Sequence, residues 1–357
     1  MQNRIRYIDG LRAVAVLGVA AYHGYQYATA APMGLTTQLF NIGAHGVDLF
    51  FVISGFCLAY PYLWQLRSEG RIDFHPHDFA AKRLVRIVPP YYAAIFILAV
   101  AAWLHVYPGI PRADLIREAF FVDWGTHLSN ISFWSLAVEW RWYFYFAPVL
   151  LLYAWRPWSL TALAASAYLA YCLLPVHVVD LGLIGSFFSG IFAADLHIRA
   201  SGLCRYVSAF LLPSVVIGAL TLPNVIGNFS SPPLQVAAFA LVVLAGSNRL
   251  FGRILSHRSL TWIGERSYSI YLMHLPVIMM LVRYFHPAWP LATLLSVIAG
   301  ALFWFLTERW VTQRSVRSGF VRWYVGRAEA LPRALRGERV RSVVFRSPDK
   351  LIEPGVE

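Results

Sequence analysis

Long apolar runs alternate with short polar loops along most of this chain. Each run is close to the length, about 20 residues, that an α-helix needs to cross the hydrocarbon core of a bilayer. Ten runs can be separated, at residues 8–28, 41–63, 84–107, 131–155, 158–176, 181–198, 203–222, 233–248, 264–284 and 291–309. The pattern predicts an all-α fold, a polytopic membrane bundle of about ten transmembrane helices.

Composition and loop charge add an orientation to this picture. The chain is 58% hydrophobic and 13% charged, against roughly 25% charged residues in soluble domains. If Arg205 and Arg283 are counted with the loops that they adjoin, twelve lysines and arginines lie before the first run or in the even-numbered loops, and three lie in the odd-numbered loops. Because positive loops stay on the cytoplasmic side, we expect both termini in the cytoplasm and the protein in a bacterial inner (plasma) membrane. The net charge of +12 follows from this asymmetry and does not indicate a nucleic-acid partner.

We divide the chain into a transmembrane domain, residues 1–310, and a basic cytoplasmic tail, residues 311–357. A basic tail is either a solvated extension or a surface helix attracted to anionic lipid. No fused soluble domain is expected. The three cysteines show no metal-binding or disulfide spacing, so we expect neither a metal nor a disulfide.

The first apolar run, DGLRAVAVLGVAAYH, contains Arg12 and His23. Ionisable residues inside a membrane helix are costly and usually functional. Their spacing is about three helical turns, which places both on one face about 16 Å apart along the axis. An imidazole can remove a proton from a hydroxyl or carry an acyl group itself. A structural histidine bonded to a neighbouring helix is the alternative.

The third run begins with KRLVRIVPPYY, in which Arg83 and Arg86 share a helix face. Each guanidinium group can form bidentate hydrogen bonds with phosphate oxygens, so Arg83 and Arg86 together with Arg12 suit a polyphosphate arriving from the cytosol. The alternative is ordinary anchoring of the helix by positive loop residues.

Two carboxylates lie closer to the opposite, periplasmic ends of their predicted helices. Asp48, in AHGVDLFFVISGF, and Glu139, in SFWSLAVEWRWYFYF, lie about 10 and 12 Å from the periplasmic helix ends. Either can orient and stabilise a catalytic imidazolium, or can simply hold helices together by hydrogen bonds. His274 can complete a polar cluster, while Glu308 is expected to pair with an arginine.

In their order along residues 9–274, these segments together resemble the acyltransferase family 3 of membrane acyltransferases. The matching pieces are DGLRAVAVLGVAAYH, GVDLFFVISGF, KRLVRIVPPYY, FWSLAVEWRWYFY and SYSIYLMH. The resemblance implies a helix bundle that transfers an acyl group, usually acetyl, from cytosolic acyl-CoA to a hydroxyl of a sugar or glycoconjugate. The chain departs from the family pattern at Glu308, where TERWV lacks the proline that often follows the Glu-Arg or Glu-Lys step.

Carried over by position, the resemblance makes His23 the catalytic histidine and Arg12 its paired arginine. It assigns Arg83 and Arg86 to the arginine pair, and Glu139 to the acidic residue of the WSL segment. The implied donor is acetyl-CoA and the acceptor a surface polysaccharide or its lipid-linked precursor, with a macrolide or small glycoside as alternatives. A proton-coupled transporter is the alternative from another class, because buried histidines and carboxylates also form proton relays.

Overall fold

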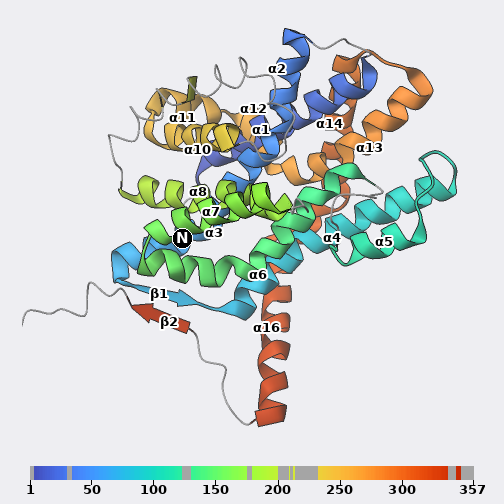
Figure 1. Ribbon diagram of the computed structural model, residues 1–357. Coiled ribbons are helices and arrows are strands. Elements are labelled where there is room, and N and C mark those ends of the chain that lie inside the picture. The colour runs from blue at the N-terminus through green and yellow to red at the C-terminus, as the bar shows by residue number, and fades with distance from the viewer. Residues whose placement is uncertain are drawn as a thin grey trace, which may run out of the picture.

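The computed structural model describes residues 4–29, 34–122, 130–174, 179–199, 209, 212–213, 232–336 and 343–346. Apart from two short strands, the regular structure in these residues is helical, as the apolar runs predict (Figure 1). The elements before the gap at 200 are α1 (Arg6–Ala28), α2 (Leu35–Ala44), α3 (Gly46–Glu69), β1 (Arg71–Phe74), α4 (Pro76–Trp103), α5 (Arg112–Ala119), the 3-10 turn η1 (Ile131–Phe133), α6 (Trp134–Trp155), α7 (Trp158–Leu173) and α8 (Val179–Arg199). Those after it are α10 (Pro232–Ser247), α11 (Arg249–Leu255), α12 (Arg258–Glu265), α13 (Ser267–Phe285), α14 (Trp289–Leu306), α15 (Glu308–Thr312), α16 (Arg314–Arg336) and β2 (Val343–Arg346).

Most predicted runs correspond to one helix. The runs 158–176 and 233–248, for example, become α7 and α10 with boundaries that move by at most three residues. The run 203–222 lies almost wholly outside the described residues. Among the described helices, five are long and apolar enough to cross a membrane, or six if the bent pair α10–α11 is one span. The helices α1 and α6 are not among the five. The prediction of ten spans therefore remains a prediction.

The predicted helix 41–63 is interrupted. It divides at His45 into α2 and α3, and His45 leaves the helical conformation with a ψ of 4°. The glycines on both sides of the break lie against the backbone of α1: a Cβ at Gly43 would collide with the carbonyl of Gly18, and one at Gly46 with that of Ala15. Small residues allow helices in membranes to approach this closely. The break places Asp48 in the first turn of α3.

Helix α1 is central to the bundle, since it packs against α2, α3, α12, α13 and α14. A second close contact joins α3 to α8. Here a Cβ on Gly55 would meet the carbonyl of Phe187, and a Cβ on Gly190 would meet that of Val52. Helix α3 thus lies between α1 and α8, and residues of α1, α3, α4, α6 and α13 meet around one interior space.

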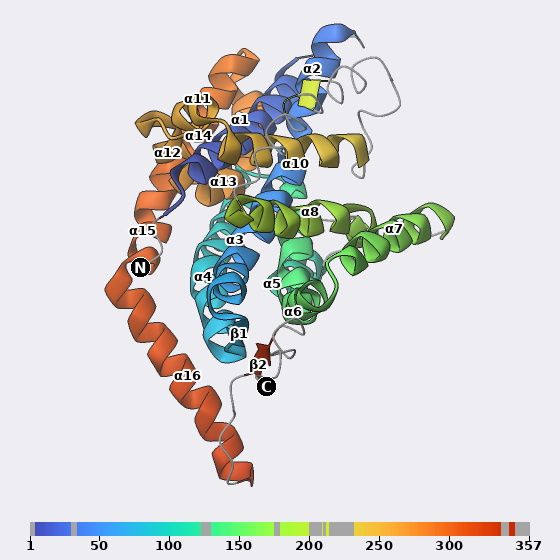
Figure 2. The ribbon, with the colours of Figure 1, turned by 90° about the vertical axis from the view of Figure 1, so that its left-hand side faces the viewer.

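The strands were not predicted from the sequence. β1 follows α3 directly and pairs in antiparallel register with β2, so that Arg71 lies opposite Arg346 and Phe74 opposite Val343. Between the bundle and β2, helix α16 packs on α4 and then extends away from the other helices (Figures 1 and 2). The C-terminal segment therefore returns to the loop between α3 and α4.

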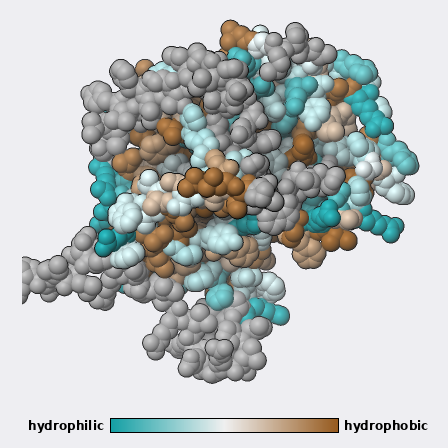
Figure 3. Space-filling model, viewed as in Figure 1, coloured by the Kyte–Doolittle hydropathy of each residue, from teal (hydrophilic) through white to brown (hydrophobic). Residues whose placement is uncertain are grey.

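The outer surface carries many large apolar side chains. Phe96, Phe144 and Leu306 are 69%, 70% and 75% exposed, and several hydrophobic patches lie on the face shown in Figure 3. Soluble monomers rarely expose contiguous apolar patches of large size. The surface fits a bundle surrounded by lipid.

Candidate active site

His23 lies next to a second histidine. Its Nδ1 is 3.0 Å from Nε2 of His274, which projects from α13 and is completely buried. Nδ1 of His274 is in turn 2.7 Å from the backbone carbonyl of Tyr271. The sequence identified both histidines but not their contact.

For two neutral rings, these contacts determine which nitrogens carry the protons. A carbonyl oxygen can only accept, so the Nδ1–H of His274 donates to Tyr271 and its Nε2 is left as an acceptor. Nδ1–H of His23 therefore donates to Nε2 of His274. The carbonyl of Val19 is a second acceptor beside His23, one turn earlier. The remaining nitrogen of His23, Nε2, then carries a free lone pair and can act as a base.

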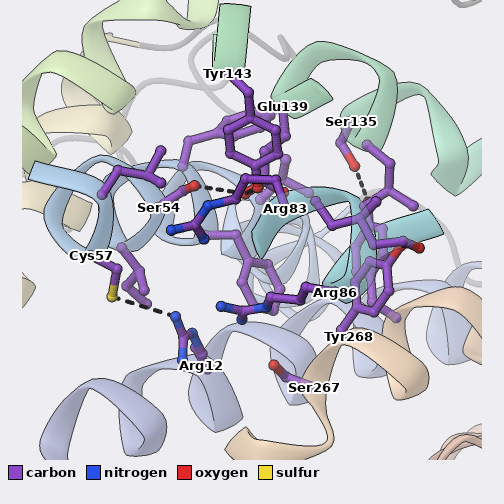
Figure 4. Close-up of a pocket in the computed structure, with 18 residues that line it drawn as sticks. Arg12, Ser54, Cys57, Arg83, Arg86, Ser135, Glu139, Tyr143, Ser267 and Tyr268 are labelled. Atoms are coloured by element: carbon purple, nitrogen blue, oxygen red, sulfur yellow. Dashed lines mark hydrogen bonds between the residues drawn. The ribbon is translucent and has the colours of Figure 1, made fainter. Parts of the chain in front are cut away.

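Arg12, Arg83 and Arg86 line one cavity, with a volume of about 80 Å³. Arg12 comes from α1 and the other two from α4, and Figure 4 shows the three guanidinium groups directed into the same space. The space exceeds what one water molecule needs. The sequence placed these three arginines together, and the structure brings them together.

The arginines differ in what they already contact. Arg12 donates to Oδ1 of Asp9 at 3.2 Å and to Sγ of Cys57 at 3.4 Å. Arg83 lies near the rings of Phe79 and Tyr143, and its buried Nε has no hydrogen-bond partner. Within the part of the chain that is described, neither Arg83 nor Arg86 forms an ion pair with a carboxylate. Two of the three cations are therefore open to an anion in the cavity.

Glu139 belongs to this cavity and not to the histidine pair. Its Oε1 accepts hydrogen bonds from Ser54 Oγ at 2.6 Å and from the Tyr143 hydroxyl at 2.7 Å, and Figure 4 shows it beside Arg83. The depth estimated from the sequence was along the helix axis and did not specify which way the side chain pointed. Glu139 contributes negative charge near Arg83 and Arg86.

Asp48 also has other partners. Its Oδ1 accepts from Ser186 Oγ at 2.9 Å, and its Oδ2 lies 2.8 Å from Nδ1 of His45. His45 lies at the break between α2 and α3, and Ser186 belongs to the neighbouring helix α8. This geometry corresponds to the packing role left open by the sequence.

Tyr271 connects the two centres. It lines the arginine cavity, its hydroxyl lies 2.7 Å from Ser135 Oγ, and its carbonyl holds His274. Sequence reasoning missed Tyr271, Ser54 and Cys57, although Tyr271 and Ser54 lie inside motifs that were singled out and Cys57 directly follows one.

Glu308 is buried at the junction of α14 and α15, where its Oε2 accepts from Ser269 Oγ at 2.7 Å. The charges of Arg86 and Arg12 act on it. Beyond α15, desolvation and the nearby charge of Arg86 lower the pKa of Arg317 in α16, while Asp78 acts in the opposite direction. Positive charge thus accumulates at this end of the cavity.

The described residues hold no group of three histidine, cysteine or acidic side chains that would suit a metal.

Known proteins resemble this chain over most of its length. A family model described as an acyltransferase domain matches residues 5–309. The O-acetyltransferase OatA of Staphylococcus aureus, in strains NCTC 8325 / PS 47 and COL, is 26% identical over 334 residues, which cover 78% of this chain and 51% of the relative. The chain thus spans about half the length of these curated relatives. No solved structure matches it.

Proposed function

Because this chain belongs to the acyltransferase family whose domain covers residues 5–309, we propose that it is an integral membrane O-acyltransferase of the bacterial inner membrane. It transfers an acetyl group from cytosolic acetyl-CoA to a hydroxyl of a surface polysaccharide or of its lipid-linked precursor. The name of its relative OatA supports O-acetyl transfer. In the proposed ten-span topology, with both termini in the cytoplasm, the arginine cavity faces the cytosolic donor.

The observation that carries the proposal is the cavity in which Arg12, Arg83 and Arg86 meet. Polyphosphate binds best to guanidinium groups that are desolvated and not already neutralised. Arg83 and Arg86 are buried and form no ion pair among the described residues, although the charge of Glu139 acts on both guanidinium groups. The diphosphate of acetyl-CoA is therefore assigned to them, with Arg12 beside it.

From the diphosphate, the pantetheine arm extends into the bilayer toward His23. Arg12 and His23 are separated by about 16 Å along α1, which is within the reach of an extended arm. The thioester then lies near the histidine pair, while the acceptor hydroxyl approaches from the periplasm or from the membrane.

The transfer needs one base that later acts as an acid. Nε2 of His23 takes the proton of the acceptor hydroxyl while the oxygen attacks the thioester carbon. The tetrahedral intermediate collapses by breaking the carbon–sulfur bond, and the departing thiolate takes the proton back from His23. The products are the O-acetyl ester and free CoA. His274, by accepting from Nδ1 of His23, directs the basic nitrogen toward the substrate, a role that carboxylates have in other triads.

Labelled acetyl-CoA tests the proposal. Membranes containing the wild-type protein are expected to transfer label into lipid-linked or polymeric glycan as an alkali-labile ester, and His23→Ala membranes are not. His197→Ala is the matched control, because His197 is, like His23, a partly buried histidine with a ring partner, here Tyr7, but lies outside the site. Equal labelling by wild type and His23→Ala would remove His23 from the chemistry. Uptake of a glycan or glycoside substrate into vesicles without acetylation would contradict the enzyme hypothesis and favour a transporter.

A separate prediction concerns His274 as a positioning residue. His274→Ala is expected to lower kcat about 10²-fold or more, since the basic nitrogen of His23 loses its orientation. His274→Gln keeps an oxygen that can accept from Nδ1 of His23 and should recover part of this loss with an unchanged KM for the donor. If glutamine and alanine reduce kcat equally, the hydrogen bond does not contribute to catalysis.

A further inference from the structure

A second cavity adjoins the arginine cavity. Its volume is about 420 Å³, and it lies between the end of α3, strand β1 and the start of α4. Leu58 and Arg83 line both cavities. A ligand bound along Arg83 can therefore occupy both spaces at once.

The walls of this second cavity combine aromatic rings with hydrogen-bond acceptors. Tyr62, Trp64 and Phe79 supply the rings, and Trp64 is 48% exposed. Aromatic faces of this kind bind flat heterocyclic bases by stacking. The cavity thus offers a surface that the phosphate-binding arginines do not.

The carboxylates in the cavity are not equivalent. Asp78 is paired with Lys82 and Glu69 with Arg71. Asp73 has neither a lysine nor an arginine partner among the described residues; one of its oxygens lies 3.3 Å from Nε2 of His75 and forms no hydrogen bond. Its side chain is 30% exposed and lines the cavity. Asp73 is consequently the acceptor best placed for an amino group on a ligand.

We infer that the second cavity binds the purine base of the nucleotide donor, with Trp64 stacking on the base and Asp73 accepting from its exocyclic amino group. The inference rests on the proposed function. A thioester donor whose diphosphate lies on Arg83 has two arms: the pantetheine points into the membrane, so the nucleoside points the other way, into this cavity. A carboxylate accepts from an amino group and repels a carbonyl oxygen, which predicts selectivity for adenine.

The test compares acetyl-CoA with its deaminated analogue, in which hypoxanthine replaces adenine and a carbonyl oxygen replaces the amino group. The wild-type enzyme is expected to prefer acetyl-CoA by at least about 10-fold in kcat/KM. Asp73→Asn should reduce or invert this ratio, because an amide can donate to the carbonyl. The ratio of the two donors does not depend on how much protein is folded. Asp114→Asn, a buried aspartate of α5 outside both cavities, should keep the wild-type ratio.

A second variant probes the stacking wall. Trp64→Ala should raise the KM for both donors about 10-fold and leave their ratio near that of the wild type, since it removes stacking but not the acceptor. If the wild type uses both donors equally, or Asp73→Asn retains full preference for adenine, the base lies elsewhere and this inference is wrong while acyl transfer stands. If neither thioester yields an ester, the proposed function fails and this inference with it.

Discussion

Two pairs of arginines near the same ends of the helices differ in what they contact. Arg67 of α3 and Arg199 of α8 converge on the buried carboxylate of Asp195, which also accepts from the Tyr153 hydroxyl. Arg83 and Arg86 of α4 face a cavity instead. In the first pair the protein neutralises its own charge, so the contacts hold helices together. In the second pair neither guanidinium forms an ion pair among the described residues, so both remain available to a ligand.

The comparison also explains why charge alone does not identify a site. All four arginines fit the positive-inside pattern of the sequence. Only the partners of each guanidinium separate a structural role from a binding role, and the partner of Arg67 comes from a helix 128 positions further along the chain. Substitutions in the two groups should accordingly affect different measurements.

The largest effect on stability is expected from Asp195→Ala. It leaves two guanidinium groups and the Tyr153 hydroxyl without their shared acceptor. We expect a loss of about 2–3 kcal/mol in unfolding free energy, below the roughly 3–5 kcal/mol of fully buried pairs because both arginines are half-exposed and can turn to water. Thermal unfolding in detergent measures it. A raised KM for acetyl-CoA in this variant would contradict the purely structural role.

Arg83→Ala is expected to show the opposite behaviour. Removing an open cation from the donor cavity should raise the KM for acetyl-CoA about 10–30-fold, equivalent to about 1.5–2 kcal/mol for a charge-assisted contact. The unfolding temperature should stay constant or rise slightly, because the buried Nε without a partner is removed. Steady-state kinetics and thermal unfolding of one preparation compare both quantities. Lower stability with an unchanged KM would assign Arg83 to the structural group.

The smallest effect is expected from Arg199→Ala. Its side chain is 51% exposed and follows Asp195 by one helical turn, so solvent screens the pair and its loss costs under about 1 kcal/mol. Neither the KM nor the kcat of acetyl transfer should change. A loss as large as that of Asp195→Ala would mean that Arg199, and not Arg67, supplies most of the stabilisation.

The elements that the sequence predicted correctly are those that depend on a continuous run of apolar residues. Hydropathy placed α7 and α10 within three residues, because a membrane helix depends on its own apolar run. It did not predict the break at His45, which depends on the close approach of Gly43 and Gly46 to α1. The pairing of β1 with β2 was also missed, since it joins segments about 270 residues apart in the chain.

The candidate site divides in the same way. Helical spacing placed Arg83 and Arg86 on one face, and both line the cavity with Arg12. The contact between His23 and His274 spans 251 positions of sequence, which no periodicity reveals. For Glu139, distance along the helix gave a depth but no direction around the axis, so its contact with Ser54 appears only in three dimensions.

The central claim is that the arginine cavity binds the donor and His23 performs the transfer. It is tested most directly by the rate of label transfer from acetyl-CoA in Arg86→Ala and His23→Ala membranes over a wide range of donor concentration. We predict that Arg86→Ala approaches the wild-type rate at high donor, whereas His23→Ala stays about 10²–10⁴-fold slower at every concentration. A lower maximal rate of Arg86→Ala with unchanged KM, or recovery of His23→Ala at high donor, would contradict this division of roles.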